Sequence, residues 1–222
     1  LLELPEATFD DVASAVAGAL IVAEVDRASA FFPTVRDLIV AFGDRRGDAT
    51  LAFARRNAGA GIVHLHLGDG KRGLDLVRQA LDTSELPPRV FQPTHVNRRK
   101  ALFEEALALA KRGCHVDITA FPVEEGEDAW PADEALVRYL DSGAPAERVS
   151  ISSDAGGCLP CFDAHGRVCG MDVGHSGALL ETLNALLARG LPLERVLPAF
   201  TSNVADLLRL PGKGRIRAGM DA

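Results

Sequence analysis

Short apolar runs alternate with longer amphipathic runs along most of this 222-residue chain. The short runs predict strands over 20–26, 61–68, 89–94, 114–121 and 148–154. The longer runs have apolar residues at helical spacing, and they predict helices over 8–19, 33–43, 47–59, 73–84, 99–113, 132–143 and 177–190, with one or two more over 192–210. Strands and helices in repeated succession predict parallel βαβ units, because parallel strands need a long crossover connection.

The polar residues that could carry chemistry lie at one end of every predicted strand. Glu24, His66, His95, Thr119 and Asp154 each follow the apolar part of a strand, at its carboxyl end. A β/α barrel uses all these ends, whereas an open sheet binds ligands mainly at one switch point. No Gly-x-Gly-x-x-Gly loop follows the first strand, which disfavours a dinucleotide site. We therefore predict an α/β fold of the (β/α)8 TIM-barrel type.

The composition argues against two classes of partner. The net charge of −7 disfavours binding to nucleic acid. No apolar run approaches the roughly 20 residues that span a bilayer, so we expect no membrane partner. The four cysteines are unevenly spread and no signal-peptide pattern opens the chain, so we expect a cytoplasmic protein with reduced thiols. The first residue is leucine, which suggests that the natural N-terminus is missing.

Two histidines and one aspartate predict a metal site at the mouth of the barrel. His66 and His95 end successive strands, His64 lies on the same strand face as His66, and Asp154 ends the last strand. Imidazole and carboxylate ligands suit zinc, and an open coordination position would admit a water molecule for hydrolysis. Asp154 could accept the proton of that water and deliver it to a leaving amine. Arg98, three residues after His95, could bind a substrate carboxylate.

A second group of candidate ligands follows Asp154. Cys158, Cys161, His165 and Cys169 have the spacing C-x2-C-x3-H-x3-C. This spacing is similar to that of a zinc knuckle, although its longer intervals are each one residue short. Because apolar residues are interspersed and the segment follows a strand with a candidate metal ligand, we interpret it as a substrate-facing loop, with structural zinc as the alternative.

Four segments carry a resemblance to a known family: HLHLGDGKRGL (64–74), PTHVNR (93–98), VDIT (116–119) and SSDAGG (152–157). They resemble the isoaspartyl dipeptidases, which are the β-aspartyl dipeptidases of the metal-dependent amidohydrolase superfamily. The most specific signal is PTHVNR at this interval after HLGDG. The segment 201–222 resembles the helix that closes the barrel in that family and the start of the return to a small β-sandwich. The resemblance is strongest from 61 to 160.

The resemblance implies roles for particular residues. His66 and His95 match two histidines that bind the second metal, and Asp154 matches the aspartate that binds the first metal and moves the proton. Arg98 matches an arginine that binds a carboxylate of the dipeptide. Cys158 falls where the family usually has a serine that contacts the substrate. Family members hold a binuclear zinc centre, hydrolyse β-linked aspartyl dipeptides and usually assemble as homo-oligomers, and the resemblance implies the same here.

The chain also departs from the family. Strands one to three, the His-x-His of strand one and nearly all of the β-sandwich have no counterpart. Residues 1–210 would therefore form a partial barrel with about strands 4–8, and 211–222 would begin the return segment. The ungapped match puts Val22 at the position of a bridging ligand, and Glu24, two residues on and on the same face, could take that role. The Asp-His-Arg that follows this strand in the family is Asp-Arg-Ala-Ser at 26–29.

Three functions remain open at this point. The first is metal-dependent hydrolysis of β-aspartyl dipeptides by a metal-activated water molecule, with activity only when strands one to three are also present. The second is a related amidohydrolase that acts on another amide or on a cyclic imide. The third is a catalytically inactive relative, which the departures at Val22, Arg27 and Ser29 favour.

Overall fold

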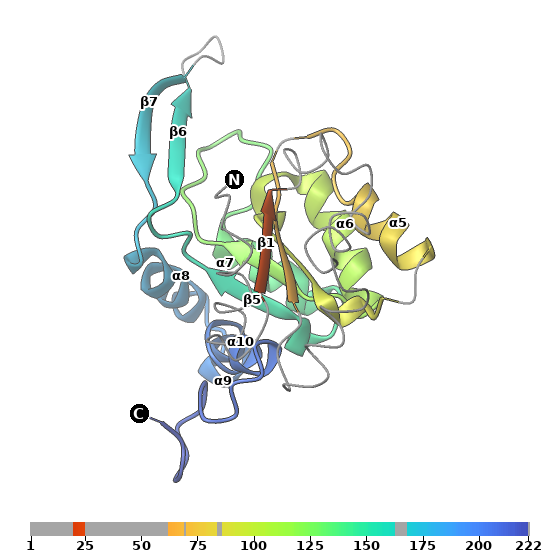
Figure 1. The fold of residues 1–222 in the computed structure, drawn as a ribbon. Helices are drawn as coiled ribbons and strands as arrows, with labels where there is room; N and C mark the ends of the chain where they lie inside the picture. Colours follow the sequence, from red (N-terminus) through yellow and green to blue (C-terminus); the bar gives the residue numbers. More distant parts are fainter. Residues whose placement is uncertain (1–19, 25–61, 69, 84–85, 163–167, 222) are drawn as a thin grey trace, which may run out of the picture.

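A computed structural model of the chain describes residues 20–24, 62–68, 70–83, 86–162 and 168–221, with side chains described for all of these except 20–24, 158–162 and 168. β1 (Leu20–Glu24), β2 (Ile62–His66) and β3 (Phe91–Thr94) form one parallel sheet, and β4 (Val116–Thr119) pairs in parallel with β5 (Val149–Ser152). β3 and β4 lie side by side, because the backbone N–H of His115 donates to the carbonyl of Phe91 at 3.0 Å. The five strands therefore follow one another in chain order, as parallel βαβ units require (Figure 1).

Helices connect these strands. α5 (Asp75–Thr83), α6 (Lys100–Lys111) and α7 (Ala132–Asp141) follow β2, β3 and β4, and α8 (Gly177–Ala188), α9 (Leu193–Val196) and α10 (Ser202–Leu207) come after β5. The described residues also include the short 3-10 helices η1 (Pro88–Val90), η2 (Val96–Arg98), η3 (Ala146–Arg148) and η4 (Leu197–Phe200). The helices predicted from 73 onward are confirmed with slightly shorter bounds, whereas those predicted over 8–19, 33–43 and 47–59 lie outside the described residues.

α6 illustrates how an amphipathic run becomes a helix that covers the strands. The buried face of this helix has apolar residues at helical spacing. Four of them are Leu102, Phe103, Ala106 and Leu109. They belong to the apolar core that also includes residues of β3 and β4. Burial of one large apolar side chain stabilises the fold by about 1.5–3 kcal/mol. The chain turns away at Gly113, whose φ of 102° suits a residue without a Cβ atom.

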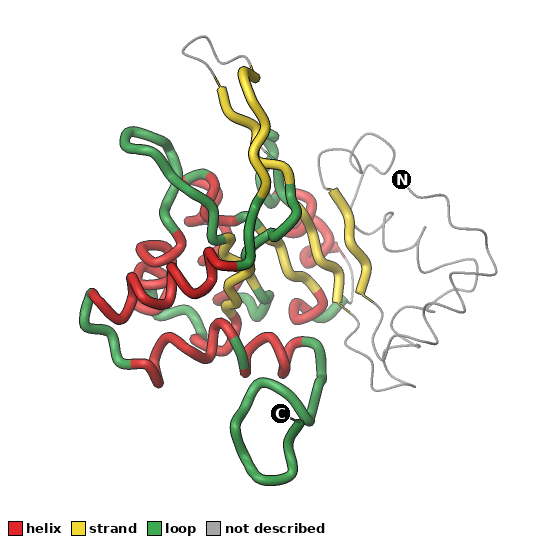
Figure 2. Tube along the Cα trace, turned by 90° about the vertical axis from the view of Figure 1, so that its left-hand side faces the viewer, coloured by secondary structure: helices red, strands yellow, loops and turns green. Residues whose placement is uncertain are grey.

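The segment after β5 differs from the predicted loop. β6 (Cys158–Phe162) and β7 (Val168–Val173) form an antiparallel hairpin, which projects from the body in both views (Figures 1 and 2). Pro160 lies within β6, although proline lacks an N–H and is unfavourable inside a sheet. It is tolerated here because, within the described residues, this sheet has only two strands and each therefore keeps an open edge.

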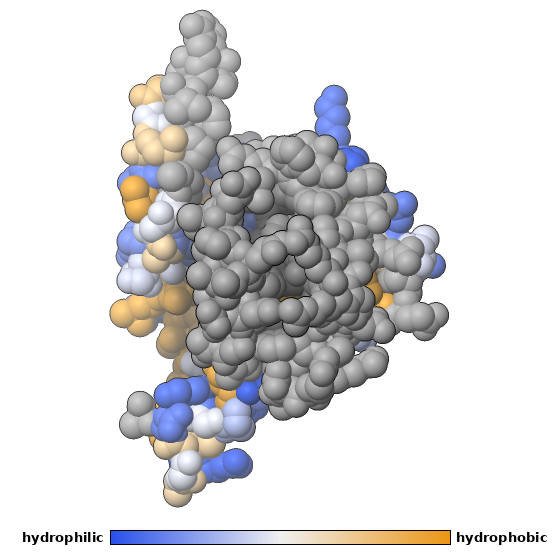
Figure 3. Space-filling view, viewed as in Figure 1, coloured by the Kyte–Doolittle hydropathy of each residue, from blue (hydrophilic) through white to orange (hydrophobic). Residues whose placement is uncertain are grey.

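α8 has apolar side chains on more than one face. Leu186 is buried, whereas Leu180 is 62% exposed. On the nearby hairpin, Met171 and Val173 are 60% and 56% exposed. Figure 3 shows apolar residues gathered at the left edge of the molecule, where Figure 1 shows α8. A helix that is apolar all round is typical of one that is covered on both sides.

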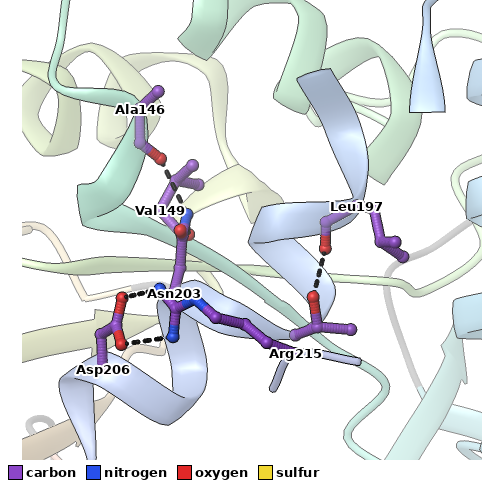
Figure 4. Close-up of polar contacts among 7 residues, drawn as sticks. Ala146, Val149, Leu197, Asn203, Asp206 and Arg215 are labelled. Atoms are coloured by element: carbon purple, nitrogen blue, oxygen red, sulfur yellow. Dashed lines mark hydrogen bonds and ion pairs between the residues drawn. The ribbon is translucent and has the colours of Figure 1, made fainter. Parts of the chain in front are cut away.

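A buried amide ties the C-terminal helices to β5. Asn203 on α10 donates from Nδ2 to the carbonyl oxygens of Ala146 and Val149, each at 2.8 Å (Figure 4). Arg215 forms two hydrogen bonds to Asp206, at 2.8 and 2.6 Å, which link the C-terminal segment to α10. The assignment of 211–222 to a return segment stays a prediction. None of the described helices combines the length and apolar character needed to cross a membrane.

A partly buried histidine at the amino end of β4 should make the fold sensitive to acid. Arg148 donates to Nε2 of His115 at 2.7 Å, which requires a neutral ring. Burial, together with the charges of Arg148 and Arg89, lowers the pKa of His115 to about 4, against about 6.5 in an unfolded chain. The unfolded chain therefore binds this proton more readily than the folded chain between pH 6.5 and 4. As a result, the free energy of unfolding falls as the pH drops through this window.

We expect His115→Gln to reduce that fall by up to about 3 kcal/mol, because glutamine can still accept from Arg148 but takes up no proton. Urea unfolding at several pH values between 7.5 and 4 measures the effect. His175→Gln, which changes an exposed histidine, is the matched control and should leave the slope unchanged. If His115→Gln had the same pH slope as the unaltered chain, His115 would not be the group responsible.

Candidate metal centre

Three side chains meet at the carboxyl ends of β2, β3 and β5. The candidate ligand atoms of His66, His95 and Asp154 all lie within 4.8 Å of one another, and each residue is partly buried. Nδ1 of His66 is 2.9 Å from Nε2 of His95. Among the described residues, no other group of three or more His, Cys, Asp or Glu is close enough to hold a metal ion. The structure thus brings together three of the residues that the sequence selected.

The backbone at two of these residues is strained. His95 has a φ of 61° and Asp154 has a φ of 48°, in the left-handed region that L-amino acids avoid. The only other non-glycine residue of this kind in the described part of the chain is Arg209, which lies just beyond α10. Such a conformation costs about 1–3 kcal/mol, and residues of this kind cluster at functional sites.

Two glycines at the base of the hairpin allow the chain to pack against Asp154. A Cβ atom at Gly157 would lie 2.5 Å from Oδ2 of Asp154, and one at Gly174 would lie 2.5 Å from its carbonyl oxygen. The N–H of Gly157 donates to that carbonyl oxygen at 2.8 Å, and Gly157 and Gly174 are themselves hydrogen-bonded at 2.9 Å. The root of the hairpin therefore fixes the backbone of Asp154, a role for Gly157 and Gly174 that sequence reasoning missed.

His95 is neutral at physiological pH. Burial is the largest cause, and it outweighs the opposing effect of the Asp154 carboxylate, so that the pKa of His95 is lowered to about 4. Its Nδ1 lies 2.8 Å from Oγ1 of Thr119, which leaves Nε2 facing His66. A neutral imidazole with one nitrogen engaged and the other facing the cluster is the form in which histidine binds metals.

Asn97 is another residue that sequence reasoning did not select. Its side chain is fully buried in the turn after His95, and it accepts from the N–H of Thr119 at 2.9 Å. It also donates to the carbonyl oxygens of Thr119 and Trp130, at 3.0 and 2.8 Å. Asn97 thereby holds the end of β3 against the end of β4 and keeps Thr119 beside His95. Its place in PTHVNR, between a strand and a helix, was the available signal.

The other predicted site residues are Glu24, Arg98 and Cys158, and the structure describes the side chain of Arg98 alone. The backbone of Glu24 pairs with that of His66 in the β1–β2 register, so Glu24 ends the strand next to the cluster, although its side chain lies outside the described residues. Arg98 follows His95 by one 3-10 turn, and its Nη1 donates to the carbonyl oxygen of Leu67 at 2.6 Å. The backbone of Cys158 lies in β6, but its side chain is also outside the described residues.

The alternative structural zinc site also lies largely outside the described residues. His165 falls in the gap between β6 and β7, and the side chains of Cys158 and Cys161 are not described either. Cys169 is exposed. The substrate-facing loop that we predicted here is instead the β6–β7 hairpin, and the zinc-knuckle alternative stays untested.

Comparison with known proteins gives a consistent result. No protein-family model matches the chain. It is similar to the crystal structure of the β-aspartyl dipeptidase of Fervidobacterium islandicum AW-1 in complex with β-Asp-Leu, with 35% identity and a TM-score of 0.72 over 86% of this chain and 48% of that one. For another crystal structure of β-aspartyl dipeptidase from F. islandicum AW-1, the identity is 31% and the TM-score 0.68, over 86% of this chain and 46% of that one. The chain thus spans about half the length of these structures.

Proposed function

Because this chain is related to the β-aspartyl dipeptidases, we propose that it provides part of a metal-dependent hydrolase that cleaves β-aspartyl dipeptides. The observation that carries the proposal is the convergence of His66, His95 and Asp154 at the carboxyl ends of three strands. The proposed fold is the corresponding part of a TIM-type barrel, from about strand four to strand eight. This placement accounts for the position of the cluster, since barrel enzymes carry their active sites at that end.

The donor set fits a divalent metal. Two imidazole nitrogens and one carboxylate oxygen are ligands that zinc accepts, and three protein ligands leave a position open for water or substrate. Zinc in a binuclear centre, with Glu24 as a further ligand from β1, is the arrangement that we propose. When bound, such a metal supplies Lewis acidity that makes a water molecule nucleophilic near neutral pH.

The side chains of the chain have distinct tasks in this proposal. A carboxylate oxygen of Asp154 accepts a proton from the attacking water molecule and returns it to the nitrogen of the leaving amino acid. The base of the hairpin holds the backbone of Asp154, since the N–H of Gly157 donates to its carbonyl oxygen at 2.8 Å. Arg98 binds a carboxylate of the dipeptide through its planar guanidinium group. Cys158 contacts the substrate, as the family resemblance implies.

Replacement of Arg98 by methionine should lower kcat/KM for β-Asp-Leu by the equivalent of about 2–4 kcal/mol, because a buried charge-paired contact is lost. Steady-state kinetics on three substrates identifies the carboxylate concerned. The C-terminal amide of β-Asp-Leu lacks the leucine carboxylate, and β-Ala-Leu lacks the α-carboxylate of the aspartyl residue. The variant should be as active as the unaltered chain on the substrate that lacks the relevant group. An equal loss on all three substrates would mean that Arg98 acts only by supporting the loop through Leu67.

The substrate class is tested by comparing hydrolysis rates for β-Asp-Leu, α-Asp-Leu, dihydroorotate and an N-acetyl amino acid, each with added Zn2+. We expect turnover of β-Asp-Leu alone. Turnover of dihydroorotate or the N-acetyl compound instead would favour the related amidohydrolase. If none of the four were hydrolysed by a zinc-loaded protein in which strands one to three are also present, the catalytically inactive relative would be the better description.

Two further expectations stay predictions. The homo-oligomer implied by the family resemblance would bury the apolar surface on α8 and the hairpin, where Leu180, Met171 and Val173 are more than half exposed. A cytoplasmic location remains a prediction from the amino-acid composition.

A further inference from the structure

A carboxylate is buried next to the candidate metal centre, and the proposed reaction gives it no task. Asp117 on β4 is 3% exposed. Its Oδ2 accepts hydrogen bonds from Thr94 Oγ1 at 2.6 Å and Ser152 Oγ at 2.5 Å, and its Oδ1 accepts from Ser150 Oγ at 2.5 Å. A carboxylate can only accept, and each hydroxyl group has one hydrogen to give. The direction of all three hydrogen bonds is therefore fixed by Asp117.

The first consequence reaches His64. Because the hydrogen of Ser150 points to Asp117, Ser150 Oγ must accept from Nε2 of Gln92, which lies 3.0 Å away. This contact orients the amide of Gln92 so that its Oε1 faces Nδ1 of His64, also at 3.0 Å. An amide oxygen cannot donate, so His64 carries its proton on Nδ1. The ring of His64 in turn lies edge-on to that of His66, with 5.0 Å between the ring centroids.

The second consequence reaches His95. The hydrogen of Thr94 also points to Asp117, so Thr94 Oγ1 is left as an acceptor for the hydroxyl of Thr119, 3.4 Å away. With its own hydrogen directed there, Thr119 Oγ1 accepts from Nδ1 of His95 at 2.8 Å. His95 then carries its proton on Nδ1 and has its lone pair on Nε2, the nitrogen that faces His66.

We propose that Asp117 is a positioning residue, which keeps a proton on Nδ1 of both His95 and His64 through two separate chains of hydrogen bonds. In this way it presents Nε2 of His95 to the metal. The part of the inference that concerns metal affinity rests on the proposed function, whereas the tautomers do not depend on it. Outer partners of this kind fix the ring of a ligating histidine, and their removal typically costs roughly 10- to 100-fold in metal affinity or activity.

The direct test is Asp117→Asn in the 222-residue chain. An amide has one accepting oxygen and one donating nitrogen, so asparagine can preserve only one of the two hydrogen-bond chains. We expect at least one of His64 and His95 to change tautomer in the metal-free chain, as seen in long-range 15N–1H correlation spectra of the imidazole rings. We also expect the affinity for Zn2+, measured by competition with a chelator, to fall roughly 10- to 100-fold.

Three further variants separate the two chains of hydrogen bonds. Thr94→Val should change the tautomer population of His95 alone, and Ser150→Ala that of His64 alone. Ser152→Ala removes a hydroxyl from the same Oδ2 atom of Asp117 but lies on neither path, so both tautomers should persist and the affinity for Zn2+ should change by less than about threefold. If Asp117→Asn does not fold, these three variants still test whether the two chains of hydrogen bonds fix the tautomers.

The inference is overturned if both imidazoles keep their proton on Nδ1 in Asp117→Asn, or if Thr94→Val leaves His95 unchanged. Failure of the proposed function gives a different result. In that case the tautomers would shift as expected, but the unaltered chain would show no specific binding of Zn2+.

Discussion

Replacement of Asp154 by asparagine is expected to lower kcat/KM for β-Asp-Leu by roughly 10²- to 10⁴-fold, the range that a positioned general acid–base group contributes. Asparagine has nearly the same size and retains one oxygen that can face the cluster. It cannot accept the proton of the attacking water or return it to the leaving amine. Steady-state kinetics at saturating Zn2+ measures the change, so that a weaker metal affinity does not contribute.

Asp172→Asn is the matched control for this variant. Asp172 lies on the adjacent hairpin, is exposed and is not one of the three clustered residues. Its carboxylate accepts from the backbone N–H of Val173. We expect kcat/KM to change less than twofold in this control. A loss of similar size in both variants would indicate a general effect of charge near the hairpin rather than proton transfer by Asp154.

Replacement of His95 by alanine is expected to weaken Zn2+ binding roughly 100- to 1,000-fold. The apparent free energy of zinc binding at structural sites is about 10–16 kcal/mol, so one ligand of four accounts for about 2.5–4 kcal/mol. The variant should fold, because His95 is only partly buried. Isothermal titration in the presence of a competing chelator measures the affinity.

His175→Ala is the matched control, because it also replaces a histidine by alanine. His175 is exposed and lies outside the three-residue cluster. Its affinity for Zn2+ should equal that of the unaltered chain. If His95→Ala bound Zn2+ as tightly as this control, the metal would be held elsewhere, and the role of His95 would have to be abandoned.

The strands and helices could be predicted from the sequence because their signals are local. The strand IVHLH and the run from Lys100 to Lys111 each have one dominant pattern, and the structure follows it. The cluster could be predicted for a related reason. His66, His95 and Asp154 all follow apolar strands, and parallel strands in chain order bring their carboxyl ends to one side.

The parts that could not be predicted depend on contacts between distant residues. Asp117 is one of four residues in VDIT, and nothing local indicates that hydroxyl groups from β3 and β5 would converge on it. The two glycines at the base of the hairpin are informative only once Asp154 is known to approach them within van der Waals distance. The hairpin itself was not predicted, because the pairing of β6 with β7 depends on contacts between two segments rather than on one local pattern.

The central claim is that His66, His95 and Asp154 bind one common cation. The most direct measurement is an anomalous difference map from crystals of the chain grown with Zn2+, with data collected on either side of the zinc absorption edge. The account predicts a peak about 2.0–2.2 Å from Nδ1 of His66, Nε2 of His95 and a carboxylate oxygen of Asp154. A peak at the Cys158–Cys169 segment alone, or no peak at these three residues with zinc in excess, would contradict it.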